Sequence, residues 1–503
     1  MSRRRIVLVQ PACGKYDLFI RDMPLGLIYT ARLLVAEGYD VRIVDQRVLK
    51  ERTRDELRRQ VTEEPPLWVG FTVMTGEPIY HTMRLAELVR RHCDAPLVWG
   101  GIHPTILPEI TIVHPLVDYL VRGKGERAAL ALSRAVAGQI GLADVPGLTW
   151  LDGDGGIQSN AEDDDSTWGR MPPVPYHLVD IDDYARSGFD GRVFPIMTSR
   201  NCPHKCTFCY NSALKHKLRW FPDSVDDTIA HIDRILAEFA PSYLSFIDDD
   251  FFVDLDRSRA ILRHVEAVKP PEVKVGFRGV RVSDLRQLTD DDLELLRRVN
   301  TRHLNIGVES GSDRVLKMLK KGMRAEHAVA VNRRFARYPD FVPLYNFFSG
   351  IPGETEEDIR LSTQLILQLT AENPHCQISG FHQYTPYPGN ELFDQAVEAG
   401  FPVPRTLEEW GDLRFEDNAR KCPWIDARRR RLLETIYCMI YFVDAKYDMY
   451  FADSSPLLKA LHPLVNLYKP VARFRLRHHV TALPLEIWAK DAFYALFYRA
   501  AKD

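Results

Sequence analysis

The stretch Thr198-Ser-Arg-Asn-Cys202-Pro-His-Lys-Cys206-Thr-Phe-Cys209-Tyr210 follows a short apolar segment at residues 193–197 and contains a C-x3-C-x2-C triplet. Iron–sulfur cubes bound by cysteine normally take four thiolate ligands. A cube held by three thiolates leaves one iron open to bind another molecule, and that open iron is a reaction site. The triplet therefore predicts an iron–sulfur cluster in a loop that follows a strand.

Two simpler interpretations of the triplet stay open on spacing alone. A zinc ion would bind Cys202, Cys206 and Cys209 with His204, although structural zinc sites usually add a second ligand pair some distance away, and no second C-x2-C pair occurs in the chain. A disulfide with one free thiol is the other alternative. The remaining five cysteines are scattered and do not form a disulfide framework, so the cysteine pattern indicates a reducing, cytoplasmic environment.

Length and composition indicate a multidomain globular protein. The chain has 503 residues, of which 45% are hydrophobic and 27% charged, which corresponds to about three domains at ~150 residues per domain. The net charge of −3 gives no reason to expect a nucleic-acid partner. The basic N-terminus is not followed by the apolar segment of a signal peptide, and no run has the length of a transmembrane segment.

Residues 1–150 alternate short apolar strands with amphipathic helices, which predicts a doubly wound α/β domain of flavodoxin or Rossmann type. Strands are expected at residues 6–10, 41–45, 68–72, 97–100 and 117–122, with helices at 25–37, 53–61, 79–92 and 126–137. Ligands of such sheets bind beyond the carboxyl ends of the strands. We therefore expect a ligand near the loops at residues 11–24, 72–78, 100–108 and 123–126.

Residues 151–190 are acidic and predict a linker, and a second alternating series over residues 191–400 predicts a partial (β/α)6 barrel of TIM type. Its strands are expected at residues 193–197, 243–247, 274–277, 303–308, 342–348 and 377–383. Chemistry in such barrels takes place at the carboxyl ends of the strands. Residues 401–503 are rich in basic and aromatic side chains and predict a helical C-terminal domain, either a cap on the barrel or a membrane-surface element.

The cysteine spacing resembles the cluster motif of the radical S-adenosylmethionine (SAM) enzymes. The N-terminal half adds Met23-Pro-Leu-Gly-Leu-Ile-Tyr29, Trp99-Gly-Gly-Ile-His-Pro-Thr105 and Val117-Asp-Tyr-Leu-Val-Arg-Gly-Lys-Gly-Glu126. With these motifs, residues 5–400 resemble the cobalamin-binding radical SAM family, which includes class B methylases and anaerobic protoporphyrin-ester cyclases. The resemblance implies three cofactors, namely a [4Fe-4S] cluster, SAM and cobalamin.

The resemblance also implies an activity. In this family the cluster cleaves SAM to a 5'-deoxyadenosyl radical, and in the methylases cobalamin carries a methyl group to an unactivated carbon of a small-molecule substrate. An external donor of flavodoxin or ferredoxin type supplies the electron. The alternatives are a radical cyclisation, oxidation, dehydration or rearrangement without methyl transfer and, in another functional class, a redox sensor built on cobalamin or the cluster. The substrate is expected to be a small molecule rather than a macromolecule, and one that is comparatively bulky or apolar.

The motifs of the first domain suggest which residues contact cobalamin. By resemblance they are Gly100, Gly101, His103, Thr105, Gly123, Gly125 and Glu126. The glycines would let a bulky ligand approach the backbone, although glycines that serve only tight turns would produce the same pattern. The D-x-H-x-x-G signature, whose histidine binds cobalt, is absent, and His103 lies in another loop. We therefore expect any bound cobalamin to have no protein histidine on its cobalt.

The barrel motifs suggest SAM contacts at the predicted strand ends. By resemblance, Phe208 packs near the adenine, one of the Asp248–Asp250 triplet, most simply Asp249, receives the ammonium or ribose, and Glu309 and Ser310 lie at the carboxylate and ribose. Arg278, at the end of the third strand, would pair with the SAM carboxylate. His382 and Tyr384 are weaker candidates for substrate contact. Capping, surface ion pairs or ordinary packing would also account for the acidic, arginine and tyrosine positions.

Overall fold

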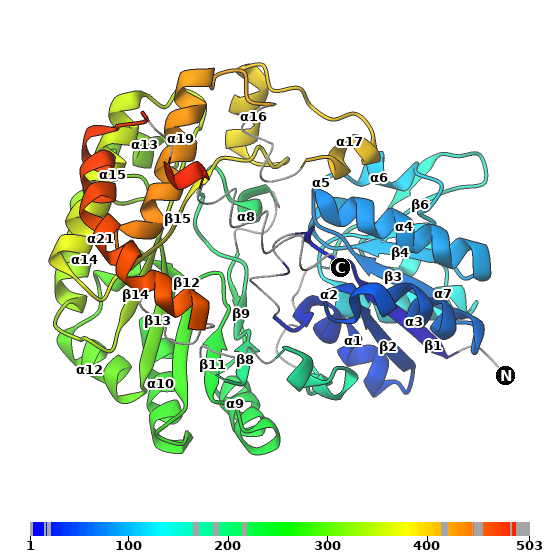
Figure 1. Ribbon diagram of the computed structural model, residues 1–503. Coiled ribbons are helices and arrows are strands. Elements are labelled where there is room, and N and C mark those ends of the chain that lie inside the picture. Colours follow the sequence, from blue (N-terminus) through cyan, green and yellow to red (C-terminus); the bar gives the residue numbers. More distant parts are fainter. Residues whose placement is uncertain are drawn as a thin grey trace. The chain divides into compact units, whose positions relative to one another are not determined.

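The computed structural model describes residues 4–14, 17, 22–163, 171–184, 191–213, 219–413, 421–444, 446, 456–482 and 485–488. The chain forms two compact units (Figure 1). The first contains Met1–Ala185, Tyr387–Gly389 and Pro402–Asp417, and the second contains Arg186–Pro386, Asn390–Phe401 and Asn418–Asp503. The segment at residues 402–417 therefore belongs to the first unit, although the sequence analysis placed it with the C-terminal helical domain.

The first unit is a seven-stranded sheet with the order β2-β1-β3-β4-β5-β6-β7. Its strands are β1 (Arg5–Gln10), β2 (Asp40–Asp45), β3 (Trp68–Thr72), β4 (Leu97–Gly100), β5 (Tyr119–Val121), β6 (Leu148–Leu151) and β7 (Ile157–Ser159). The first five strands pair in parallel. The order 2-1-3-4-5 is that of the flavodoxin-like doubly wound sheet, which confirms the fold class predicted for this domain.

Amphipathic helices cover the two faces of this sheet. The pair α1 (Leu25–Ala36) and α7 (Gly125–Val136) packs together, and so does the pair α3 (Thr53–Thr62) and α4 (Glu77–His92). α17 (Leu407–Gly411) returns from the far part of the chain to pack against α4. The antiparallel strands β6 and β7 were not predicted, because strands of four and three residues are too short to show alternation clearly.

The second unit contains a six-stranded sheet with the order β15-β14-β13-β12-β11-β8, and each neighbouring pair is parallel. The strands are β8 (Val193–Ile196), β11 (Tyr243–Phe246), β12 (Lys274–Arg281), β13 (Thr301–Glu309), β14 (Val342–Ser349) and β15 (Gln377–Gln383). A sequential parallel order with a helix between strands is the pattern of a partial TIM-type barrel. This confirms the predicted barrel.

Four of the five crossover helices begin after a residue whose side chain caps the first turn. The five helices are α9 (Val225–Phe239), α10 (Leu255–Val268), α12 (Asp290–Arg298), α14 (Ala325–Phe335) and α15 (Glu356–Glu372). Ser224, Asp254, Thr289 and Thr355 each accept a backbone N–H in the first turn of the helix that follows. Each cap helps to fix the loop between a strand end and the next helix, which is where the site lies.

The C-terminal region is helical, as predicted, with α19 (Ala427–Met439) and α21 (Pro456–His478) as its main elements (Figure 1). Pro463 and Pro470 lie inside α21. Among the described residues, no helix has the length and apolar character needed to cross a membrane.

Candidate active site

The cysteine triplet lies in the loop between β9 (Ser199–Arg200) and α8 (Tyr210–Ala213). Cys202 and Cys206 are buried and Cys209 is half-buried. The loop is fixed to two later segments, because the Thr207 N–H donates to Leu319 O at 3.2 Å and the Thr207 carbonyl accepts from Leu392 N at 2.9 Å. The loop therefore has a defined conformation in the folded chain.

The three consecutive aspartates after β11 have three different roles. Asp248 is buried and accepts from the backbone N–H and hydroxyl of Thr198 at 3.0 and 2.9 Å, so it supports the base of the cysteine loop. Asp250 is buried beside His204, with His204 Nε2 3.6 Å from its Oδ2. Asp249 is half-buried and accepts the hydroxyl of Tyr210 at 2.9 Å. Asp249 is thus the most accessible of the three, which is consistent with its choice as the SAM contact.

Arg281, at the end of β12, contacts the cluster loop directly. Its Nη1 donates to Cys206 Sγ at 3.0 Å and its Nη2 donates to Lys321 O at 2.6 Å. The side chain is buried, so both hydrogen bonds form in a medium that screens charge poorly. A guanidinium bonded to a ligand sulfur favours the thiolate form and stabilises negative charge on a cluster.

A buried ion pair lies at the end of β13. Lys321 Nζ donates to Glu309 Oε1 at 3.0 Å. Glu309 is in the left-handed region with φ 72°, which is uncommon for a residue with a side chain and typical of functional sites. A Cβ at Gly307 would lie 2.4 Å from Glu309 Oε1 and 3.0 Å from Lys321 Nζ, so a larger residue there would displace the charged ends of this pair.

Aromatic rings continue from the cysteine loop to the neighbouring strands. The ring of Phe208 lies 4.9 Å from that of Phe348, and Phe348 lies 6.5 Å from Tyr384. Lys321 Nζ is 5.8 Å from the centre of the Phe208 ring. Phe208 lies in the cysteine loop, Asp249 follows β11 and Glu309 ends β13, and their contacts with the adenine, ammonium and ribose of SAM stay predictions.

Cys202 takes part in a possible site for a single ion. Among the described residues, the ligand atoms of Cys202, His204 and Asp250 all lie within 4.8 Å of one another. A zinc ion holds all its ligands about 2.0–2.3 Å from one centre, so zinc bound by this group would leave two cysteines of the triplet unused. A four-iron cube would use all three thiolates.

Burial also determines the state of the free thiols. It raises the pKa of Cys202 to about 12 and that of Cys209 to about 11. Metal ligands must be deprotonated, so these thiols give up their protons when the cluster binds and its positive irons stabilise the thiolates.

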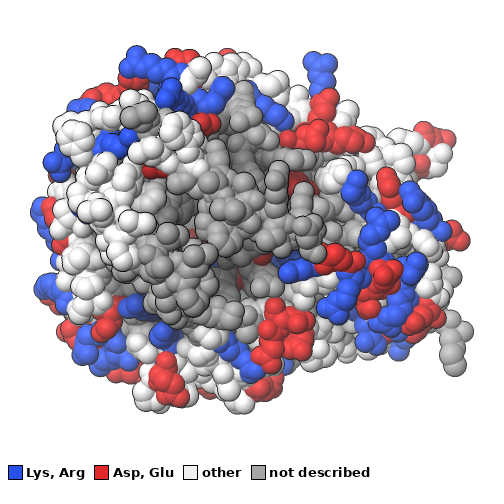
Figure 2. Space-filling model, in the orientation of Figure 1, with Lys and Arg blue, Asp and Glu red and all other residues white. Residues whose placement is uncertain are grey.

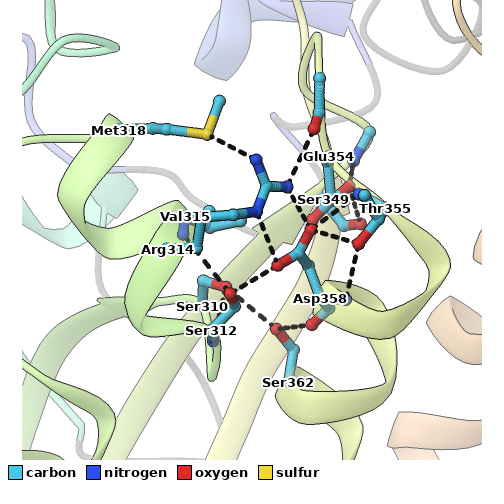
Figure 3. A network of polar contacts seen from close by, with 12 residues as sticks. Ser310, Ser312, Arg314, Val315, Met318, Ser349, Glu354, Thr355, Asp358 and Ser362 are labelled. Carbon is cyan, nitrogen blue, oxygen red and sulfur yellow. Dashed lines mark hydrogen bonds and ion pairs between the residues drawn. The ribbon is translucent and has the colours of Figure 1, made fainter.

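A second polar network joins the ends of β13 and β14 to the start of α15 (Figure 3). Arg314 bonds Asp358 and donates to Gly353 O at 2.9 Å, and Asp358 also accepts from Ser312 at 2.6 Å. Glu354, after β14, accepts from the Ser349 hydroxyl at 2.7 Å and the Gly350 N–H at 2.6 Å. Burial raises the pKa of Glu354 to about 7. The network fixes the relative positions of two strand ends that border the site.

The structure places four other predicted residues as follows. Arg278 is exposed within β12, three residues before the strand ends. Ser310 is buried, and its hydroxyl contacts that of Ser362 at 3.1 Å. His382 is half-buried in β15, with its ring 6.4 Å from Tyr437. Tyr384 is buried just after β15. Their roles in binding SAM or substrate stay predictions.

The carboxyl edge of the first unit is compact around its glycines. Gly101 has φ 98°, and a Cβ there would lie 2.9 Å from the backbone N and O of Val73. A Cβ at Gly125 would lie 2.6 Å from the Thr30 hydroxyl. Thr105 bridges the loops after β4 and β5, because its hydroxyl accepts from Gly123 N at 3.1 Å. These glycines are already required by packing within the protein, and Gly100 and the buried Glu126 lie on the same edge.

His103 lies in this edge as a buried neutral imidazole. Burial lowers its pKa to about 4, Nδ1 lies 3.0 Å from the Thr75 hydroxyl, and the ring meets Trp410 edge-on. Nε2 has no hydrogen-bond partner among the described residues. Buried polar groups are normally hydrogen-bonded, so this edge fits a ligand that offers polar groups, as the amide-bearing cobalamin does.

Comparison with known proteins gives one family match in each of the two α/β units. The radical SAM superfamily matches residues 196–366, and the B12 binding domain matches residues 23–133. With the three-cysteine loop at the carboxyl end of a parallel barrel, this makes the chain a radical SAM enzyme. Because a B12-binding domain precedes the barrel, the chain has the two domains that cobalamin-binding radical SAM enzymes combine. Its cofactors are therefore a [4Fe-4S] cluster, SAM and cobalamin.

Relatives similar to most of this chain are named for different activities. An uncharacterised methyltransferase, PH0819, of Pyrococcus horikoshii is 27% identical, covering 79% of this chain and 84% of the relative. Cytidylyl-2-hydroxyethylphosphonate methyltransferase of Streptomyces wedmorensis is 24% identical (80% and 83%). Anaerobic magnesium-protoporphyrin IX monomethyl ester cyclase of Rubrivivax gelatinosus is 26% identical (74% and 66%).

A solved structure shares the fold along nearly the whole chain. The cobalamin-dependent SAM radical enzyme OxsB, with aqua-cobalamin and SAM bound, matches with a TM-score of 0.73 and 17% identity, covering 99% of this chain and 76% of that chain. At this identity the match supports the fold.

The structure also identifies residues that the sequence analysis missed. Arg281 contacts Cys206 in the cysteine loop, and Lys321 contacts Glu309. Glu354 accepts a hydrogen bond from Ser349 in the network at the strand ends. For Arg281 a signal existed, because the strand pattern continues past Phe277 to residue 281. Lys321 comes after an intervening helix, α13 (Asp313–Met318), and no local pattern indicates its contact with Glu309.

Proposed function

We propose that this enzyme transfers a methyl group from SAM to an unactivated carbon of a small molecule. One observation carries the proposal: a barrel loop with three cysteine ligands occurs in one chain with a B12-binding domain. When bound, the cluster supplies the electron that cleaves SAM, and cobalamin supplies the methyl carrier. Two of the compared relatives are named as methyltransferases, which supports methyl transfer over other outcomes.

The residues of the chain hold and orient these groups. Cys202, Cys206 and Cys209 bind three irons, so the fourth iron stays available to SAM. The Arg281 guanidinium donates to Cys206 Sγ and holds a positive charge beside this proposed ligand. The Glu309–Lys321 pair presents fixed charges at the end of β13, and Phe208 offers an apolar face near the same point. Because these side chains are buried or packed, little water remains to quench a reactive species.

The test is anaerobic reconstitution with iron, sulfide and hydroxocobalamin, followed by turnover of SAM with a reductant. Methylation predicts S-adenosylhomocysteine and 5'-deoxyadenosine formed in step with a methylated product. The control replaces Cys202, Cys206 and Cys209 by alanine, which removes the cluster and abolishes SAM cleavage. A protein that purifies with one zinc ion and no inorganic sulfide would contradict the proposal.

A radical cyclisation or other reaction without methyl transfer is the second candidate, because one relative is named as a cyclase. That reaction makes 5'-deoxyadenosine without coupled S-adenosylhomocysteine, so the same assay separates the two. A redox sensor predicts an intact cluster that never cleaves SAM. We further propose a reducing, cytoplasmic environment, supported by the scattered cysteines, which do not form a disulfide framework. We also propose an external electron donor of flavodoxin or ferredoxin type.

A further inference from the structure

The helix α21 buries two apolar residues, Ala472 and Leu476, and also the charged Arg475. Arg473 Nη1 donates inward to Val443 O at 2.9 Å, and Arg475 Nε lies 3.1 Å from the buried Glu486 carboxylate. Amphipathic surface helices normally bury their apolar stripe and expose their charges. Here two of the arginines point to protein acceptors.

The opposite side of α21 is apolar. Leu464, Leu467, Val471 and Phe474 are 62%, 77%, 46% and 59% exposed. Their spacing of three or four residues places them on one face of the helix. Trp488, in the segment after the helix, is 56% exposed. Scattered exposed apolar side chains need no explanation, but a continuous row of this kind marks an interaction surface.

The charge near this face identifies the partner. The α21 sequence contains five Lys and Arg residues and no Asp or Glu. Of these, Arg473 and Arg475 bond protein acceptors, whereas Arg477 is exposed with His478 at the C-terminal end. Figure 2 shows the surface over this part of the second unit, at the left, as mainly white with Lys and Arg at its margin. An apolar row with aromatic side chains and neighbouring cations is typical of helices that lie in the interface of anionic membranes.

We propose that the apolar face of α21 docks this enzyme on the surface of an anionic lipid bilayer. Leu464, Leu467, Val471 and Phe474 enter the boundary between headgroups and acyl chains, and Arg477 approaches the lipid phosphates. The helix lies in the plane of the surface and does not cross it. This inference is independent of the reaction that the barrel catalyses.

Co-sedimentation of the full chain with lipid vesicles tests the proposal. We expect binding to vesicles of phosphatidylcholine mixed with phosphatidylglycerol, weaker binding to phosphatidylcholine alone, and weaker binding at high salt. Leu467→Glu should lower the affinity for the mixed vesicles by about tenfold or more, because it replaces an inserted apolar side chain by a charge. Val113→Glu is the matched control, since Val113 is 59% exposed in the first unit and should leave binding unchanged.

Arg477→Glu tests the electrostatic part without changing the apolar face. Its expected loss is also about tenfold, from reversing one charge near the lipid surface. Circular dichroism and thermal melting check that each variant folds, so Arg477→Glu keeps the test valid if Leu467→Glu does not. Equal sedimentation of all variants, or no sedimentation of the wild type, would overturn the proposal. So would a dimer in light scattering that Leu467→Glu abolishes while vesicles do not bind, because a second copy would then cover the face.

Discussion

The contact between Arg281 and Cys206 predicts an effect on the reduction potential of the cluster. Arg281 donates to the Cys206 sulfur at 3.0 Å and to the Lys321 carbonyl at 2.6 Å from a buried position. Reduction adds negative charge to the cluster, so the guanidinium stabilises the reduced form more than the oxidised form. The change Arg281→Gln keeps a polar side chain of similar reach and removes the positive charge.

The size of the effect follows from the hydrogen bond. A hydrogen bond to a charged group contributes about 1.5–3 kcal/mol. If about half of this depends on the oxidation state, the conversion of ~59 mV per 1.4 kcal/mol for one electron gives a midpoint potential lower by roughly 30–60 mV. We expect a shift in this range in Arg281→Gln, measured by potentiometric titration of the reconstituted cluster with detection by electron paramagnetic resonance.

Arg278→Gln is the matched control, because Arg278 is an exposed arginine on the same strand. It removes the same charge from β12 without removing a bond to sulfur, so the potential should stay near the wild-type value. Iron and sulfide analysis must show equal cluster content in the three proteins. An unchanged potential in Arg281→Gln, or equal shifts in both variants, would refute the reasoning.

Three further predictions concern Gly307, Glu354 and His103. Gly307→Ala should destabilise the fold by about 3 kcal/mol in urea unfolding, because its Cβ disrupts the buried Glu309–Lys321 pair; a cost no larger than that of an exposed Gly→Ala change would contradict this. Burial raises the pKa of Glu354 from 4.5 to about 7, so the folded state holds a proton that the unfolded state releases, and stability falls as pH rises through this window. In Glu354→Gln the amide oxygen can accept from both donors, so the decrease in unfolding free energy between about pH 5 and about pH 8 should be about 3 kcal/mol smaller than in the wild type. The same difference in unfolding free energy between variant and wild type at both pH values would contradict this prediction. His103→Ala should leave the nitrogen splitting of bound, reduced cobalamin unchanged in electron paramagnetic resonance, because the buried imidazole contacts Thr75 and is not expected on cobalt; loss of a splitting present in the wild type would show that His103 is a ligand.

The two sheets were predictable because their signal is local. The sequence pattern alternates apolar strands with amphipathic helices. The strands predicted from it correspond to β1 to β5 and to all six barrel strands, with bounds that differ by a few residues at most. The same holds for the cysteine triplet, whose three ligands lie within eight consecutive residues. Such features depend on short-range periodicity and spacing, which the order of residues contains directly.

The strand ends were less predictable, and they carry much of the site. β12 was expected to end at residue 277, but shifts in its register extend it to Arg281, whose guanidinium contacts Cys206. Glu309 was found from its motif, yet its left-handed backbone and its partner Lys321 depend on a bulge beside β14. Irregular backbone of this kind is stable only because surrounding contacts hold it.

The amino-acid sequence by itself determined the order of the elements and the two α/β units of this protein, and it predicts the three cluster ligands. Only the tertiary structure decided which charged side chains meet the cysteines, which of the three aspartates stays accessible, and which side of α21 faces outward. The physical reason is that periodicity and ligand spacing are properties of neighbouring residues. Burial, hydrogen bonding and the direction of a helix face instead depend on residues that are distant in the chain and become neighbours only after folding.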